Sequence, residues 1–580
     1  MSIPKPNRYP YLSQSILLFI FLLLGCYFRF ANLSVKIFWV DEIATVVRAS
    51  GYTIQEVTNH LARRDIISFN DLISYQNITP EKTFIDSWNA LIKSPEHAPL
   101  YFVLTRFWMQ IFGSSISTVR SFSAVSSLFI FPALYWLCQE LFNRQSTSTI
   151  ALLLMSISPF YVTYAQEARP YSLWTVSILL ISASLLKAIR VNTQASWVIY
   201  SVSLTIGLYT SLFTFYIAFF QAIYLLSARI KYKIEILKKY ALFSLISLLA
   251  FSPWIVVIIS HLNLLQENTS WMRGNFNLTE IIAVFIGTIL LIFGDLPISP
   301  NSNPAQTAIA LIVIVFTCLG TLILARHLKH RWLKFALLLI ISSSIFLLFN
   351  YVYLDLVSII GAAVALCILS FSAYSIYYLI LNSDHALFII CLIISLPLPL
   401  LVIDIINQGQ GSTAPRYLIP LQLGIQIAAA HTIANKIALI KDRKIWQFIL
   451  SGFLILGIFS CIRNFNLSPF YQKGRNINNP AIAQIINRSD RPLVAAEADN
   501  AMDVLSLAYS LSLDTQYKII DSNNSLIKYS DRFEDIFILK PSVSYIDKIK
   551  QNPLVSLRQV YKSQVFSADE IPLDLWQIHQ

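Results

Sequence analysis

Residues 15–30 read SILLFIFLLLGCYFRF, and after a short polar segment residues 38–42 read FWVDE. The first stretch is apolar enough to enter a bilayer, and the acidic pair Asp41-Glu42 lies just past its end. A carboxylate beside a hydrophobic segment is costly to desolvate, so such residues usually have a functional role. This arrangement indicates chemistry at a membrane–water boundary.

The composition is that of a membrane protein. Of 580 residues, 56% are hydrophobic and 13% are charged, whereas soluble domains carry about 25% charged residues. Segments of about 20 apolar residues cross a bilayer core. We predict a polytopic α-helical membrane protein with about 13 spans, at residues 15–31, 120–140, 148–164, 171–189, 196–208, 210–227, 241–261, 305–325, 334–350, 356–381, 386–406, 415–435 and 445–463. Residues 279–294 are predicted to lie in the outer face or re-enter it.

The distribution of charge predicts the orientation. The net charge is +12, yet residues 464–580 hold 12 Lys and Arg against 13 Asp and Glu, so the excess lies in the membrane part. Basic loops favour the cytoplasmic side. With the N-terminus inside, the inner loops hold sixteen basic residues, and the short outer loops hold only Arg169, Arg273 and Arg416. This predicts a multi-pass plasma (inner) membrane protein with Asp41-Glu42 and the C-terminal tail on the periplasmic or extracytoplasmic face. The location of the excess positive charge in the membrane part also argues against nucleic-acid binding.

Two domains are expected. Residues 1–463 form the transmembrane domain, including an outer loop over 32–119 with amphipathic helices, of which 97–112 resembles a helix lying in the interface. Residues 464–580 alternate between strand-like and helical segments, which predicts a small α/β domain.

The six cysteines form no CxxC pair, which argues against a zinc cluster or a disulfide framework. The first apolar stretch lacks a cleavage site and is expected to be a retained anchor.

Three charged features fall on the predicted outer side at one membrane depth. They are Asp41-Glu42, the turn QEAR at 166–169, and APRY at 414–417. Helix packing can bring their carboxylates and guanidiniums together. Such a site suits a substrate whose anionic head lies at that depth while its apolar tail stays in lipid.

Six motifs carry a resemblance to a known superfamily. FWVDE, HAPLY at 97–101, RSFSAVSSLF at 120–129, SPFYVTYAQEARPYSLW at 158–174, GLYTSLF at 207–213 and APRYLIP at 414–420 resemble the GT-C membrane glycosyltransferases. They are most similar to bacterial relatives of protein O-mannosyltransferases and lipid A aminoarabinose transferases. The resemblance covers roughly the first 230 residues and the region around Arg416, and QEARPY is its most specific part. The family usually has His-Pro-Pro-Leu where this chain has His97-Ala98-Pro99-Leu100.

The resemblance implies the GT-C fold and transfer of a sugar from a polyprenyl phosphate carrier to an acceptor on the outer face, with inversion at the anomeric carbon. A carboxylate must deprotonate the acceptor hydroxyl, and fixed cations would stabilise the departing phosphate. Asp41 is the predicted base. The predicted catalytic residues are Asp41, Glu42 and Glu167, and the predicted carrier-phosphate and donor residues are His97, Arg169, Arg416, Tyr417 and Tyr164.

Each of these residues also has an alternative, purely structural role. Asp41-Glu42 could begin a helix over 43–50, Glu167 and Arg169 could pair with each other, and Arg416 could be an interfacial anchor. His97 could begin a helix, and Tyr164 could belong to an aromatic belt.

The sequence has no nucleotide-binding motif. A divalent metal is the one cofactor left open, although no His-x-x-His or Asp-x-Asp motif on the outer side supports it. The expected partners are the lipid-linked sugar donor, membrane lipid and a protein, glycan or lipid acceptor. A transporter or flippase for lipid-linked sugars and a non-catalytic assembly subunit are the alternatives. A transporter usually has ionisable residues at the bilayer midplane and repeated halves, whereas the three charged features of this chain fall on the predicted outer side.

Overall fold

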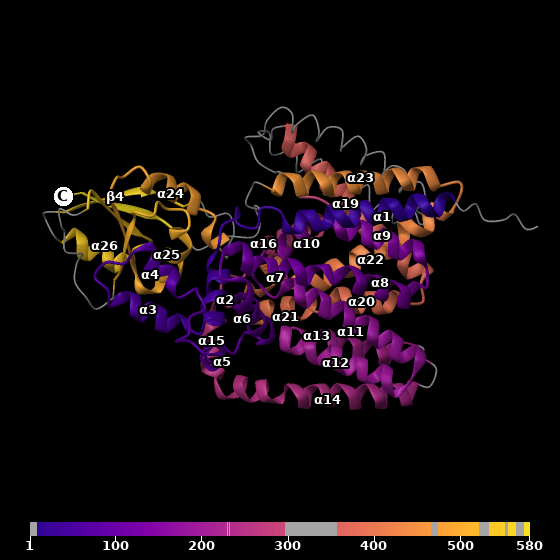
Figure 1. Ribbon diagram of the computed structural model, residues 1–580. Coiled ribbons are helices and arrows are strands. Elements are labelled where there is room, and N and C mark those ends of the chain that lie inside the picture. Colours follow the sequence, from indigo (N-terminus) through magenta and orange to yellow (C-terminus); the bar gives the residue numbers. More distant parts are fainter. Residues whose placement is uncertain are drawn as a thin grey trace, which may run out of the picture.

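A computed structural model describes residues 9–228, 230, 233–295, 356–465, 474–520, 533–551, 555–563 and 573–579. Figure 1 shows a bundle of long helices with a smaller domain containing the β-sheet at one end. The predicted spans at 305–325 and 334–350 lie outside the described residues. The fold class predicted from the sequence, a polytopic helical membrane protein with a small α/β domain, is confirmed.

The described part of the bundle is built from helices. Its helices are α1 (Tyr9–Phe30), α7 (Ile116–Leu128), α8 (Ile130–Phe142), α9 (Gln145–Ser156), α10 (Pro159–Ala165), α11 (Tyr171–Val191), α12 (Gln194–Thr210), α13 (Thr214–Ser227), α14 (Lys233–Ser260), α16 (Leu278–Leu290), α19 (Leu356–Asn382), α20 (Ala386–Ile394), α21 (Pro397–Asn407), α22 (Ile419–Ala438) and α23 (Arg443–Asn464). Helix α22 is almost wholly buried, whereas α14 exposes apolar side chains such as Leu249 and Val256. Apolar exposure of this kind is expected where a helix faces lipid.

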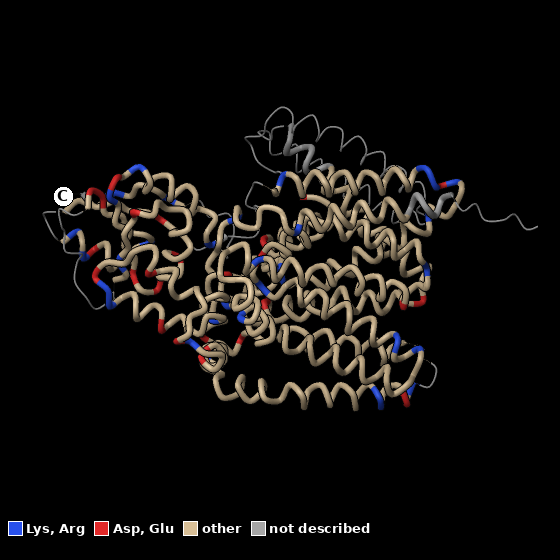
Figure 2. The backbone as a smooth tube through the Cα atoms, viewed as in Figure 1, with Lys and Arg blue, Asp and Glu red and all other residues tan. Residues whose placement is uncertain are grey.

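Within the described residues, seven helices are long and apolar enough to cross a membrane, and the bent pair α9–α10 raises the number to eight. Other predicted spans correspond to shorter helices, among them α13, and α16 is the helix predicted over 279–294. Lys, Arg, Asp and Glu gather at the ends of the bundle and toward the small domain, while long stretches of the bundle carry none (Figure 2). The total of about 13 spans stays a prediction.

The break between α9 and α10 is stabilised by a buried arginine. The two helices meet at 60°, which leaves carbonyl groups at the end of α9 without helical partners. Arg29 of α1, which is fully buried, donates to the carbonyl oxygens of Ser156 (2.8 Å), Met155 (3.1 Å) and Gly25 (2.9 Å). Non-helical backbone inside a membrane bundle requires such partners. The bend directs the short α10 into the turn that carries Glu167 and Arg169.

The outer loop predicted over 32–119 is helical. It contains α2 (Val40–Ser50), α3 (Ile54–Ala62), α4 (Phe69–Ser74), α5 (Phe84–Ile92) and α6 (Leu100–Phe112). Between α14 and α16 lie α15 (Leu262–Asn268) and the 3₁₀ turn η1 (Ser270–Met272), and between α21 and α22 lie the 3₁₀ turns η2 (Gly411–Thr413) and η3 (Pro415–Leu418). Helix α6 corresponds to the amphipathic segment predicted at 97–112, and it exposes Phe107, Ile111 and Phe112.

The C-terminal domain is a mixed α/β unit, as its alternating pattern predicted. Its sheet has the strand order β2-β1-β3-β5-β4, in which β1 pairs in parallel with β2 and β3 while β5 runs antiparallel to β3 and β4. The elements are η4 (Gly474–Asn476), α24 (Asn479–Ile486), β1 (Pro492–Glu497), η5 (Ala498–Asn500), α25 (Ala501–Ala508), β2 (Gln516–Ile520), β3 (Asp535–Leu539), α26 (Val543–Lys550), β4 (Ser556–Tyr561) and β5 (Leu575–His579).

Part of the outer loop packs on this domain. Helices α3 and α4 contact α25, and α3 also contacts β2; Figure 1 shows both helices beside the sheet domain. An isolated antiparallel bridge joins Ile67 to Tyr517. One apolar core contains Val57, Leu61 and Leu72 from the loop together with buried residues of the tail. The loop and the tail, which are distant in sequence, therefore share a core that borders the candidate site.

Candidate active site

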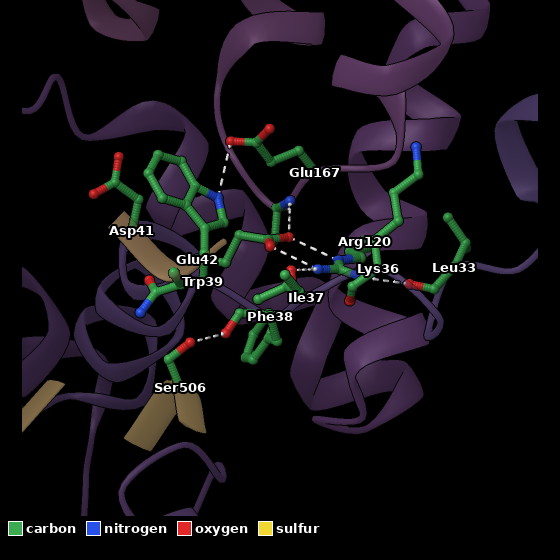
Figure 3. A network of polar contacts seen from close by, with 12 residues as sticks. Leu33, Lys36, Ile37, Phe38, Trp39, Asp41, Glu42, Arg120, Glu167 and Ser506 are labelled. Atoms are coloured by element: carbon green, nitrogen blue, oxygen red, sulfur yellow. Dashed lines mark hydrogen bonds and ion pairs between the residues drawn. The ribbon is translucent and has the colours of Figure 1, made fainter. Parts of the chain in front are cut away.

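Helix α2 presents its two acids in different directions. It begins after the extended residue Trp39, and Asp41 and Glu42 occupy its first turn, where the helix dipole favours negative charge. Successive helical residues point about 100° apart. The side chain of Asp41 is 32% exposed and lines a cavity, whereas that of Glu42 is completely buried. Figure 3 shows Asp41 directed away from the partners of Glu42.

Glu42 is held by Arg120 of α7. The Arg120 guanidinium donates to both carboxylate oxygens of Glu42, through Nε (2.8 Å) and Nη2 (2.7 Å). Its other N–H groups donate to the carbonyl oxygens of Leu33, Lys36 and Ile37 at 2.7–3.0 Å. All five donors of this guanidinium are thus used, and the segment before α2 is fixed to α7. Arg120 lies in the RSFSAVSSLF motif, but its role could not be predicted from the sequence.

The turn after α10 is joined to the same segment and to α2. Gln166 donates to the carbonyl oxygens of Phe28 (2.6 Å) and Ala31 (2.8 Å). The backbone N–H of Ala168 donates to Glu42 (2.8 Å), and Glu167 accepts a hydrogen bond from the Trp39 indole (3.1 Å; Figure 3). These bonds fix the position of the next residue in the turn, Arg169.

Arg169 forms an ion pair with Asp41, and both residues line the cavity. Its Nη2 lies 3.7 Å from Asp41 Oδ2, and its Nη1 donates to Thr45 Oγ1 (3.0 Å) and to the Asp41 carbonyl oxygen (3.3 Å). The side chain is 8% exposed. The predicted meeting of an acid of the first loop with the cation of the QEAR turn is therefore present in the structure.

Arg416 is surrounded by aromatic rings. It lies in η3, and its guanidinium carbon is 5.8 Å from the Trp39 ring centre, 5.7 Å from that of Trp271 and 5.2 Å from that of Tyr417. Among the described residues, no carboxylate lies within ion-pair distance of Arg416, and its Nε makes no hydrogen bond. Arg416 is partly buried, and a cation in such a place without a matching anion loses some of its hydration. This guanidinium is therefore the group in the site best suited to an anionic ligand.

These residues line one large cavity. Its volume is about 1600 Å³, and its polar wall includes Asp41, Arg169 and Arg416 together with Arg48, Glu96 and His97. Another part of the lining is largely apolar and is formed by α16, the residues just after it and the turn between α12 and α13, with Phe213, Val284 and Leu291 among its residues. The cavity thus joins a charged region to an apolar one, as a phosphate attached to a hydrocarbon chain requires.

His97 lies on the polar wall beside two arginines. Burial, together with the charges of Arg48 and Arg169, holds the pKa of His97 well below its usual range. The ring is therefore neutral at physiological pH and can donate one hydrogen bond and accept another.

Six of the eight predicted site residues meet in the cavity. They are Asp41, His97, Tyr164, Arg169, Arg416 and Tyr417. Glu42 and Glu167 are buried behind its wall and contact Arg120 and Trp39, so we assign to them a positioning role in place of the predicted catalytic one. The sequence analysis missed Arg48, which follows Asp41 by seven residues and hence shares its helix face. No group of three or more His, Cys, Asp or Glu side chains suited to a metal occurs in the described ranges.

The helical bundle and its charged cavity are those of a polytopic membrane protein, and the motifs around the cavity resemble the GT-C membrane glycosyltransferases. Comparison with known proteins confirms this resemblance: residues 96–257 match the family described as dolichyl-phosphate-mannose-protein mannosyltransferase. The matched region contains His97, Arg120, Tyr164 and the whole QEARPY turn.

Solved structures similar to the chain include the following two. One is ArnT from Cupriavidus metallidurans bound to undecaprenyl phosphate, with 10% identity, a TM-score of 0.42 and 98% of each chain covered. Another is the archaeal oligosaccharyltransferase AglB from Archaeoglobus fulgidus in complex with an inhibitory peptide and a dolichol-phosphate, with 12% identity, a TM-score of 0.45, and 92% of this chain and 70% of that chain covered. No curated protein matches the sequence.

Proposed function

We propose that the protein is a glycosyltransferase that moves a hexosyl or pentosyl group from a polyprenyl phosphate carrier to an acceptor hydroxyl. The observation that carries this proposal is the shared cavity, in which Asp41, Arg169 and Arg416 lie beside an apolar wall. The match of residues 96–257 to a family of lipid-phosphate-sugar-dependent transferases supports it.

The carrier phosphate binds to Arg416 and Arg169 in this proposal. Arg416 has no carboxylate partner among the described residues, so an incoming phosphate supplies the missing negative charge. A guanidinium can hold two phosphate oxygens at once. Tyr164 and Tyr417 line the same region, and neutral His97 provides a hydrogen-bonding group without adding charge. The polyprenyl chain lies along the apolar wall of α16.

Asp41 acts as the general base. Its carboxylate faces the cavity and can accept the proton of the acceptor hydroxyl while the hydroxyl oxygen attacks the anomeric carbon. The bond between that carbon and the phosphate oxygen breaks, and the polyprenyl phosphate leaves with its charge stabilised by the two arginines. A single displacement of this kind inverts the anomeric configuration.

The distribution of basic loops supports an inner-membrane location with the cavity and the C-terminal domain on the extracytoplasmic side. The N-terminus is cytoplasmic in this arrangement. The acceptor is a hydroxyl group of a protein, a glycan or a lipid that reaches the cavity from that side.

The test is transfer by the purified protein. The full chain is incubated with a panel of hexosyl and pentosyl undecaprenyl phosphates and with protein, glycan and lipid acceptors, and both the released carrier and the glycosylated product are measured. Asp41→Asn should lose turnover while the protein stays folded. Glu81→Gln, which changes an exposed acid of the same outer loop outside the cavity, should retain it. Movement of labelled lipid across a vesicle membrane without release of sugar would overturn the proposal in favour of a flippase.

A further inference from the structure

The C-terminal domain reaches the cavity through one short turn. Arg475, in the 3₁₀ turn η4, lines the cavity together with Asp41. This contact could not be predicted from the sequence, because Arg475 lies in the tail, more than four hundred residues after Asp41.

A buried aspartate fixes the orientation of Arg475. Asp503 of α25 is completely buried and accepts hydrogen bonds from Arg475 Nε (2.9 Å) and Nη2 (2.8 Å). Its Oδ1 also accepts a weaker bond from Asn476 Nδ2 (3.3 Å). The remaining group of the guanidinium, Nη1, makes no hydrogen bond to the described residues, and the side chain is 28% exposed. This residue, which lines the cavity, thus keeps the two N–H groups of Nη1 without a described partner.

The neighbouring residue holds the helix that carries Asp41. Asn476 Oδ1 accepts from the backbone N–H of Val40 (3.0 Å), the first residue of α2, whose own N-cap residue Trp39 provides no side-chain cap. In addition, Ser506 Oγ donates to the Phe38 carbonyl oxygen (2.8 Å; Figure 3). A helix start without a local cap needs partners of this kind. The same turn of the C-terminal domain therefore contacts the cavity and fixes the start of α2.

We propose that Arg475 is a substrate-binding residue whose Nη1 donates a hydrogen bond to a neutral hydroxyl oxygen in the cavity. The inference rests on the proposed glycosyl transfer. Because Asp503 already matches the charge of Arg475, the pair offers directional donors and no net charge, which suits an uncharged oxygen better than a phosphate. Arg416, which has no such partner, is the better phosphate ligand. The hydroxyl belongs either to the donor sugar or to the acceptor.

The experiment compares Arg475→Lys with wild type in the full chain. Lys keeps a positive charge beside Asp503 but lacks the second amino group of the guanidinium. The matched control is Lys518→Gln, which removes a different contact between the two domains, the ion pair of Lys518 with Asp65 (3.3 Å), outside the cavity. Should Arg475→Lys not fold, the double variant Arg475→Met with Asp503→Asn removes both charges together.

Binding of bare undecaprenyl phosphate and of sugar-linked undecaprenyl phosphates is measured first, followed by the KM of the acceptor. The loss of one hydrogen bond is expected to weaken binding about threefold to tenfold. If the hydroxyl belongs to the sugar, only the sugar-linked lipids bind more weakly. If it belongs to the acceptor, only the acceptor KM rises.

Unchanged binding and unchanged KM, as in Lys518→Gln, would overturn the assignment. Lipid binding, and equilibrium binding of the acceptor where its KM cannot be measured, need no turnover, so they report on Arg475 even where wild type transfers no sugar. Failure of the transfer reaction is thereby distinguished from failure of this inference.

Discussion

Two adjacent acids of α2 are expected to respond in opposite ways to the loss of charge. Glu42→Gln leaves the Arg120 guanidinium buried beside a neutral amide, while its bonds to three backbone carbonyls keep it in place. Breaking a buried ion pair from one side costs about 3–5 kcal/mol. Asp41→Asn instead alters a half-exposed carboxylate whose nearest cation is 3.7 Å away, and such pairs contribute about 1 kcal/mol or less.

The assay is the free energy of unfolding of the purified protein in mixed micelles, obtained by titration with SDS, together with sugar transfer by the same preparations. Glu42→Gln should lower the free energy of unfolding by about 3–5 kcal/mol. Asp41→Asn should stay within about 1 kcal/mol of wild type and lose transfer. Wild-type stability of Glu42→Gln would refute the positioning role of Glu42. A fully active Asp41→Asn would refute its role as base.

Further expectations concern four other residues. Arg416→Gln should weaken binding of undecaprenyl phosphate about tenfold to a hundredfold, as measured by equilibrium binding, since a hydrogen bond to a charged group contributes about 1.5–3 kcal/mol. Arg29→Met should lower the free energy of unfolding by about 2 kcal/mol or more, because buried carbonyls at the end of α9 lose their donor. Asn476→Ala should cost about 0.5–2 kcal/mol through loss of a helix cap. For His97, whose pKa is lowered on folding, the unfolded chain binds the proton more readily, so stability falls as the pH drops below about 6.5; His97→Gln should reduce the difference in unfolding free energy between pH 7 and pH 5.

The sequence predicted those parts of the site that carry a strong local signal. Asp41, Arg169 and Arg416 are charges next to long apolar segments, so their placement is costly and their common depth could be inferred. The structure brings all three to one cavity. The strand and helix pattern of the tail was predicted for a similar reason, because period-two and helical spacing are local properties.

Other parts depend on long-range geometry. The sequence could not tell Asp41 from Glu42, because the rotation of α2 about its axis is set by Arg120 and by the turn at 166–169. Arg48 follows Asp41 on the same helix face and could have been found once the helix over 43–50 was accepted. Arg475 and Asn476 carry no signal of their own, since their contacts with the cavity and with α2 cross between the two domains.

The core shared between the first outer loop and the tail has a consequence for biosynthesis. The core that contains Val57, Leu61 and Leu72 is completed by apolar residues of the tail, which are translated much later. During synthesis these side chains lack their partners from the tail until that part of the chain emerges, and α2 lacks the cap from Asn476 until then. Folding of α2 is therefore coupled to synthesis of the tail, so a chain truncated before residue 474 would lack the contacts that hold Asp41 in the proposed active site.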